Sequence, residues 1–372
     1  MKMSFSRVMA LAGLPMLLLA LGAGSASARP ASGNPPPPKG FEADSASFVS
    51  ARTGFVLGTR GCSRLPCKAR LKETVNGGRT WTSVPVPAIS LVPPYTSAPA
   101  SAASSVRFEN ARDGWLFAPA LWATTDGGKK WHRISLPGQV IALAASDGVV
   151  FAVSEPVTGL NQARLYESRV GTTRWTLVRR IAPQNALTVF GRSVWVGIAS
   201  GVDGNLWRST DSGRHWSALS FRCPSGTISA SAVAAASTAN VAIGCSDQGA
   251  PQPGQSIKKV FTSSNGGRTF HLVGSPPLSG QIGTLAMPPG RPRLITMSAA
   301  SGATYLYRSV NGGRTWGGTV FFDGGLDSRD LAYVSGTTGY VIHFSGDPVI
   351  AYGMGLLKTS NAGATWKAAP IP

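Results

Sequence analysis

Residues 309–316 read SVNGGRTW, and this eight-residue pattern decides the fold because it returns along the whole chain. Intact copies occupy 74–81, 124–131, 209–216, 263–270, 309–316 and 359–366, and a degenerate copy occupies 168–175. The aromatic residue that ends each copy recurs about every 47 residues. A period of this length fits one four-stranded unit, and seven such units predict radial repetition, a β-propeller.

The residue types in the pattern are those of a tight turn between two strands. The Asn or Asp side chain accepts hydrogen bonds from backbone N–H groups of its own turn, and the following glycines adopt a positive φ. A hydroxyl two positions before this Asx residue bonds across the turn. The aromatic residue five positions after it is expected to fill the space between neighbouring blades. The Asx and aromatic residues are Asn76 and Trp81, Asp126 and Trp131, Asp211 and Trp216, Asn265 and Phe270, Asn311 and Trp316, and Asn361 and Trp366.

A second, weaker pattern precedes each turn. Gly-aromatic pairs begin apolar strands at 54–55, 114–115 and 339–340, and related strand starts lie at 148–149, 194–195, 240–241 and 293–294. The 45 glycines and 27 prolines among 372 residues disfavour helices and suit short strands joined by turns. The sequence therefore predicts an all-β, seven-bladed β-propeller with about four antiparallel strands per blade over residues 45–372.

The N-terminus has the features of a secretory signal peptide. Lys2 and Arg7 precede an apolar run over 8–21, and Ala-Ser-Ala follows at 26–28. We expect a signal peptide over 1–28, cut after Ala28, with an uncleaved N-terminal anchor as the alternative. A Pro-rich linker is predicted over 29–44. The protein is therefore predicted to be secreted, to an extracytoplasmic place in the cell envelope.

The four cysteines fit export to an oxidising compartment. Of the three pairings that four cysteines allow, we favour Cys62 with Cys67 and Cys223 with Cys245, because each pair would staple one connection. A zinc site is the rival interpretation, but no histidine lies close to either pair in sequence.

The charge of the chain favours anionic partners. Lys and Arg number 35 against 16 Asp and Glu, a net charge of +19. The residue after the box glycine is cationic in five intact copies: Arg79, Lys129, Arg214, Arg268 and Arg314. If the turns share one rim, these side chains form an anion-binding ring; the alternative is that they are solvated turn tips. Specific nucleic-acid binding is not expected, because the aromatic residues are committed to blade packing.

The eight-residue turns resemble the Asp-box, or BNR repeat, of sialidases, sortilin-type receptors, certain xyloglucan hydrolases and the photosystem II assembly factor. The chain looks most like wider bacterial relatives of the last group. The resemblance covers residues 45–372 and implies the propeller fold. It implies little about function, because the same boxes occur in enzymes and in binding proteins. Four of the six intact boxes carry Asn in place of Asp, which keeps the turn chemistry.

No catalytic residue, cofactor or metal ligand is predicted. The N-terminal Arg-Ile-Pro signature of sialidases is absent, and none of the five glutamates pairs in sequence with another carboxylate. Three of the four histidines lie beside a box aromatic, and the fourth lies in a strand.

We therefore expect a non-enzymatic, monomeric binding or scaffold protein that presents loops and a basic rim to a partner protein or an anionic envelope polymer or glycan. Peripheral membrane contact fits the same charge. The alternatives are a sialidase-like glycosidase that uses carboxylates in the central channel, the default ligand site, and a surface protein without a discrete site.

Overall fold

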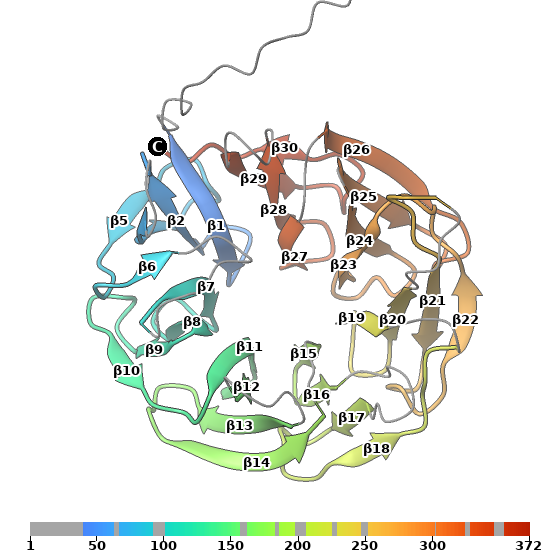
Figure 1. Ribbon diagram of the computed structural model, residues 1–372, viewed down its shortest axis with the longest axis horizontal. Helices are drawn as coiled ribbons and strands as arrows, with labels where there is room; N and C mark the ends of the chain where they lie inside the picture. The colour runs from blue at the N-terminus through green and yellow to red at the C-terminus, as the bar shows by residue number, and fades with distance from the viewer. Residues whose placement is uncertain are drawn as a thin grey trace, which may run out of the picture. The chain divides into compact units, whose positions relative to one another are not determined.

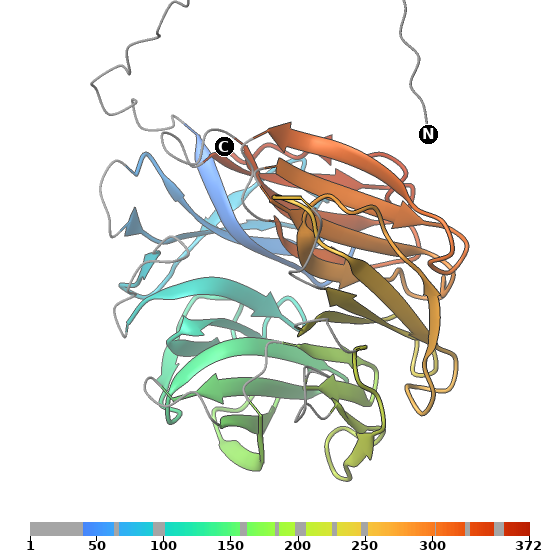
Figure 2. The same ribbon diagram turned by 45° about the vertical axis from the view of Figure 1, so that its right-hand side comes forward.

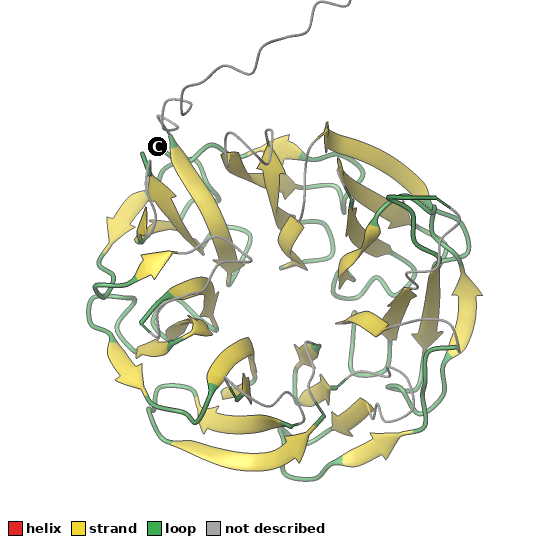
Figure 3. Cartoon of the chain, viewed as in Figure 1, coloured by secondary structure: helices red, strands yellow, loops and turns green. Residues whose placement is uncertain are grey.

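The computed structural model describes residues 40–62, 67–91, 101–156, 162–182, 186–197, 206–224, 229–246, 252–301, 303–323, 328–345 and 353–372. Residues Pro35–Pro372 form one compact unit. The predicted signal peptide over 1–28 lies outside the described residues. In the described ranges every regular element is a β-strand (Figure 3). None of these residues belongs to a helix that is long and apolar enough to span a membrane.

Seven antiparallel four-stranded sheets form the blades. Blade 1 contains β1 (Phe41–Phe48), β2 (Gly54–Arg60), β4 (Arg70–Thr74) and β5 (Thr82–Val84). Blade 2 contains β7 (Ala103–Phe108), β8 (Gly114–Pro119), β9 (Leu121–Thr124) and β10 (His132–Ile134). Blade 3 contains β11 (Gln139–Ser146), β12 (Val149–Glu155), β13 (Ala163–Arg169) and β14 (Trp175–Ile181). Blade 4 contains β15 (Leu187–Phe190), β16 (Ser193–Val196), β17 (Leu206–Ser209) and β18 (Ser217–Leu219).

The remaining blades follow the same order. Blade 5 contains β19 (Ser229–Ala235), β20 (Val241–Ser246), β21 (Lys258–Ser263) and β22 (His271–Gly274). Blade 6 contains β23 (Gln281–Ala286), β24 (Ile295–Ala300), β25 (Ala303–Ser309) and β26 (Gly317–Asp323). Blade 7 contains β27 (Ser328–Tyr333), β28 (Gly339–Ser345), β29 (Gly353–Thr359) and β30 (Lys367–Ala368). Outside the blades, β3 (Cys67–Lys68) pairs with β6 (Ser90–Leu91).

The blades are arranged in a ring, with the first strand of each nearest the centre (Figure 1) and the sheets facing one another around it (Figure 2). The predicted all-β, seven-bladed propeller is confirmed. The first strand begins at Phe41, within the segment predicted as a linker over 29–44. In that strand apolar residues bury against blade 7, which explains why the sheet starts earlier than the composition suggested.

Each blade is an antiparallel meander, so its first and third connections leave the sheet on the same side. We call this side the turn face and the opposite side the loop face. Backbone hydrogen bonds join the two connections of a blade: Gly77 N–H donates to Arg52 O at 2.7 Å, and Gly127 N–H donates to Arg112 O at 2.8 Å. The Asx boxes therefore lie on the turn face beside the short first turns.

The hydrogen bonds of an intact box are seen at Asn311. Its Oδ1 accepts from the N–H groups of Arg314 at 3.1 Å and Thr315 at 3.0 Å, and Ser309 Oγ accepts from Gly313 N–H at 2.8 Å. Gly313 has a φ of 92°, and a Cβ there would lie 2.8 Å from Val273 of the preceding blade. Only glycine meets both conditions at this position.

The box aromatics pack between blades, as the sequence predicts. Each one contacts an apolar cluster formed by its own blade and the preceding blade; Trp131, for example, lies against the cluster of Phe55, Leu71 and Leu116. The other six are Trp81, Trp175, Trp216, Phe270, Trp316 and Trp366. Trp81 is 9% exposed and the rest are half-buried. Seven such clusters form the core, one at each junction of blades.

The Gly-aromatic pattern forms a second contact between blades. The ring of Phe108 covers Gly114 of its own blade and stacks on Phe55 of blade 1, with centroids 3.6 Å apart. Phe48 covers Gly54 in the same way and stacks on Tyr340 of blade 7, with centroids 3.4 Å apart. Because a Cβ on either glycine would collide with the ring, the glycine makes this stacking possible.

The ring closes without strand exchange. All strands of blade 1 come from the N-terminal part of the chain, and all strands of blade 7 come from the C-terminal part. Their junction is held by an apolar cluster that includes Phe41, Val56 and Ile342. Lys358 Nζ on blade 7 also donates to Gly77 O of the first box at 2.8 Å.

Both predicted disulfides are confirmed, and both lie on the loop face. Cys62–Cys67 closes the connection from β2 to β3. Cys223–Cys245 ties the connection between blades 4 and 5 to the end of β20. Hydrogen bonds of the Asx boxes therefore stabilise connections on the turn face, and disulfides stabilise connections on the loop face.

Candidate anion-binding surface

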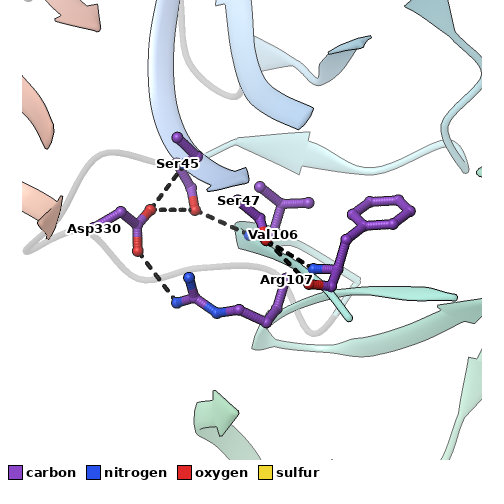
Figure 4. A network of polar contacts seen from close by, with 7 residues as sticks. Ser45, Ser47, Val106, Arg107 and Asp330 are labelled. Carbon is purple, nitrogen blue, oxygen red and sulfur yellow. Dashed lines mark hydrogen bonds and ion pairs between the residues drawn. The ribbon is translucent and has the colours of Figure 1, made fainter. Parts of the chain in front are cut away.

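The innermost strands carry a polar network where blades 7, 1 and 2 meet (Figure 4). Asp330 Oδ2 accepts from Ser45 Oγ at 2.6 Å and from Ala46 N–H at 2.9 Å, and Asp330 Oδ1 pairs with Arg107 Nη2 at 3.3 Å. Ser45 Oγ in turn accepts from Val106 N–H at 3.0 Å. The network joins β27, β1 and β7 across two blade junctions.

A second carboxylate of the innermost strands is also paired. Asp44 Oδ1 lies 3.0 Å from Arg329 Nη1, and the Asp44 side chain is only 8% exposed. A glycosidase would need two carboxyl groups that flank a bound sugar, one of them free to exchange a proton. Asp44 and Asp330 are instead committed to contacts between blades. These two ion pairs therefore stabilise the junctions between blades.

The five predicted rim residues are all exposed on the turn face. They follow the box glycines of blades 1, 2, 4, 5 and 6: Arg79, Lys129, Arg214, Arg268 and Arg314. Blade 7 has Ala364 at this position, and the degenerate box of blade 3 has Thr173. The cations therefore lie on one face of the ring, with two positions of the series uncharged.

The turn face as a whole is basic. Its connections contain twelve Arg and Lys residues against five Asp and Glu residues. Two of the five carboxylates, Asp126 and Asp211, are turned into their own boxes, where they accept backbone N–H bonds. These bonds lower the pKa of both groups; for Asp211 the largest cause is the His215 N–H, and the His215 ring adds to it.

A depression with a volume of about 1160 Å³ lies on this face over blades 2, 3 and 4. Its lining is hydroxyl-rich and basic. The titratable lining residues are His132, Asp147, Glu167, Arg169, Arg174, Arg192 and Arg214, and the hydroxyl residues are Thr125, Ser168, Thr172, Thr173, Thr176 and Ser212. The sequence pointed to the central channel as the default ligand site, whereas this depression lies away from the centre.

Local sequence explains why the surface is hollow there. The first turns of blades 3 and 4 contain only two residues each, 147–148 and 191–192, because Ser146 pairs with Val149 and Phe190 pairs with Ser193. The corresponding turns of blades 1, 2, 5 and 7 contain five residues. Less backbone therefore covers the third and fourth boxes.

The degenerate box forms the floor of the depression with a different hydrogen-bond pattern. Ser168 Oγ bonds to Thr172 Oγ1 at 3.1 Å, where an intact box would have a glycine N–H. Val170 N–H donates to Gly148 O at 2.9 Å, one position earlier than in the intact boxes. Arg169 and Arg174, at the second and seventh positions of this box, have exposed side chains.

The two carboxylates of the depression differ in exposure. Asp147 Oδ2 lies 4.0 Å from Arg192 Nε, and both side chains are more than half exposed. Glu167 Oε2 is buried close to Gly213 of the next box. Burial raises the pKa of Glu167. Burial also raises the pKa of the neighbouring Glu109, although N–H groups of Gly148 and Asp147 bond to it and act in the opposite direction.

Sequence reasoning identified Arg214 and missed Arg169, Arg174 and Arg192. The loss of the Asx and glycine at 168–175 was visible in sequence, and so were the two-residue turns. What was not visible is that turns of blades 3 and 4 bring these arginines around one hollow. Among the described residues, no group of three or more His, Cys, Asp or Glu side chains is arranged to hold a metal ion.

No family model and no curated protein matches the chain. Solved structures match it closely in fold. A GH74 xyloglucanase from Xanthomonas campestris is 15% identical over 91% of this chain and 56% of that chain, with a TM-score of 0.57. YCF48 from Cyanidioschyzon merolae is 18% identical over 90% of this chain and 99% of that chain, with a TM-score of 0.54.

The GH74 enzyme of Niastella koreensis is 14% identical over 88% of this chain and 59% of that chain, with a TM-score of 0.53. This chain thus spans little more than half the length of the two GH74 proteins and nearly the full length of YCF48. At these identities the likeness is one of fold. The chain is a seven-bladed β-propeller similar to both, on a fold that serves enzymes and binding proteins.

Proposed function

We propose that this protein is a secreted, non-enzymatic and monomeric binding protein whose turn face attaches to an anionic polymer of the cell envelope. In this proposal the signal peptide over 1–28 is removed and a Pro-rich linker precedes the propeller. The rim formed by Arg79, Lys129, Arg214, Arg268 and Arg314 supplies long-range attraction.

The observation that carries the proposal is the charge of the turn face. The rim arginines and lysine are exposed, and backbone N–H groups of the box turns that bear them donate hydrogen bonds to the Asx side chain, as at Asn311. A rigid surface loses little conformational entropy when it binds, which favours a long, repetitive ligand that touches several side chains. Two disulfides are compatible with a place outside the cytoplasm.

Two carboxylates of the innermost strands argue for binding in place of glycoside hydrolysis. Asp44 and Asp330 of the innermost strands are each paired with an arginine. The similarity to GH74 proteins is a similarity of fold over about half of their length, so it supplies no catalytic residue to this chain.

The test is retention of the mature protein on phosphocellulose compared with uncharged cellulose, at two salt concentrations. The variant Arg79→Gln, Lys129→Gln, Arg268→Gln, Arg314→Gln should elute at clearly lower salt while its thermal unfolding is unchanged. Failure of the wild-type protein to bind phosphocellulose at low salt, or unchanged elution of the variant, would contradict the proposal.

A further inference from the structure

We infer that the depression over blades 2, 3 and 4 is a discrete binding groove for a linear, phosphate-bearing polymer. This inference rests on the proposed function and assigns it a site. The groove is defined by Arg169, Arg174, Arg192 and Arg214, which come from the degenerate box, the first turn of blade 4 and the fourth box.

The four guanidinium groups surround one hollow instead of being spread around the ring. Neither Arg169 nor Arg174 forms an ion pair with a described residue, and both are exposed. Arg192 contacts Asp147 only at 4.0 Å, a weak exposed pair that a ligand can replace. Guanidinium groups bind phosphate oxygens with paired hydrogen bonds, so several of them in one hollow favour phosphate over an uncharged ligand.

The shape of the site favours a chain over a single ion. A second hollow of about 380 Å³ continues the first and shares His132 and Thr173 with it. Arg133 and Ser135 line this extension. The two hollows together form a path that leads from the degenerate box along the outer strand β10 of blade 2.

The lining also favours a hydrated polyanion over an acidic peptide. Six hydroxyl side chains line the main hollow, and Val149 is the one large apolar side chain among its lining residues. Hydroxyl groups donate to phosphate oxygens and tolerate bridging water. Apolar side chains of a peptide would find little complementary surface in the main hollow, although Ile134, Leu136 and Trp175 line the extension.

The experiment measures binding of a short linear polyphosphate to the full mature chain by isothermal titration calorimetry. The groove variant carries Arg169→Gln, Arg174→Gln and Arg192→Gln. The matched control carries Arg52→Gln, Arg291→Gln and Arg293→Gln, which removes the same charge from turns of the same face on blades 1 and 6. All six side chains are in turns or at a strand end, and thermal unfolding verifies that both variants fold.

We expect one saturable site, at least about a tenfold loss of affinity in the groove variant and less than about a threefold loss in the control. Equal losses in the two variants would overturn the groove and leave the proposed function standing, because charge alone would then explain binding. Absence of polyphosphate binding by a wild-type protein that still binds phosphocellulose would likewise overturn the groove alone. Tighter binding of polyglutamate than of polyphosphate would overturn the ligand class.

Discussion

Single residues explain how each intact box keeps its turn. Asn311 accepts two backbone N–H bonds and Ser309 accepts a third, so three donors of one turn are satisfied by two side chains. The sequence was sufficient to predict this chemistry, because an Asx box acts within eight residues. The same holds for Cys62 and Cys67, which are five residues apart. Interactions between residues that are close in sequence can be predicted from the sequence, because few other contacts compete with them.

Replacement of the Asx residue tests this account. Asn311→Ala removes the acceptor for two N–H groups and should lower the free energy of unfolding by about 1–2 kcal/mol. Asn311→Asp keeps the acceptor and should stay within about 0.5 kcal/mol of the wild type. Urea unfolding of the two variants provides the measurement, and equal stabilities would show that the side-chain bonds contribute nothing.

Two buried tyrosines, Tyr307 and Tyr340, and the partly buried Tyr333 predict a loss of stability at alkaline pH. Burial raises the pKa of Tyr307, Tyr333 and Tyr340 to about 12, whereas an unfolded tyrosine titrates near about 10. The folded state therefore keeps protons that the unfolded state has lost, so stability should fall as the pH rises from 10 toward 12.

Tyr340→Phe checks the sign and the cause. It keeps the ring that stacks on Phe48 and removes the ionisable hydroxyl. The decline in unfolding free energy above pH 10 should become shallower in this variant, as measured by urea unfolding at several pH values. An equally steep decline would mean that Tyr340 does not contribute.

At the scale of the element, blades 3 and 4 have shorter first turns than the others and blade 3 has the degenerate box, and the candidate site lies there. The strand-turn-strand pattern of blades 3 and 4 was predictable, but the hollow was not. It depends on two short first turns and on a box that lacks its Asx and glycine, all three meeting in space. Arg169 and Arg174 belong to one box, but β14 and β15 separate them in sequence from Arg192, so no spacing rule connects the three.

The box aromatics give the prediction that belongs to the element. Trp316 packs on the apolar cluster between blades 5 and 6, and its Nε1 donates to Gly313 O at 2.9 Å. Trp316→Ala should lower the free energy of unfolding by about 3 kcal/mol through the cavity it leaves. Trp316→Phe should recover part of the loss. Urea unfolding measures both variants. An unchanged free energy of unfolding for Trp316→Ala would contradict packing of this side chain between blades.

At the scale of the whole molecule, the ring needs a junction that holds its two ends together. The number of blades could be counted in the sequence, but the manner of closure could not, because residues near 45 and 330 meet only in the folded ring. Asp330 joins Ser45, Ala46 and Arg107 there, and Phe48 stacks on Tyr340. Blade 7 thus contacts blade 1 as blade 1 contacts blade 2.

Closure can be tested through Asp330. Asp330→Ala leaves Ser45, Ala46 and Arg107 without their shared acceptor and should lower the free energy of unfolding by about 2–3 kcal/mol. Asp147→Ala places alanine at a similar positive φ, 55° against 51° at Asp330, and otherwise removes only an exposed pair at 4.0 Å, so it should lower the free energy of unfolding by no more than about 1 kcal/mol. Thermal and urea unfolding compare the stabilities of the two variants. Equal losses of stability would show that Asp330 does not contribute to the contact that closes the ring.

The central claim is that the turn face, and the groove over blades 2, 3 and 4 in particular, binds a phosphate-bearing polymer. Hydrogen–deuterium exchange of the mature protein with and without polyphosphate tests it most directly. We predict slower exchange in 147–148, 170–174 and 191–192, with little change in the first turn of blade 7 at 334–338. Protection confined to the loop face, with the turns of blades 3 and 4 unchanged, would contradict the account.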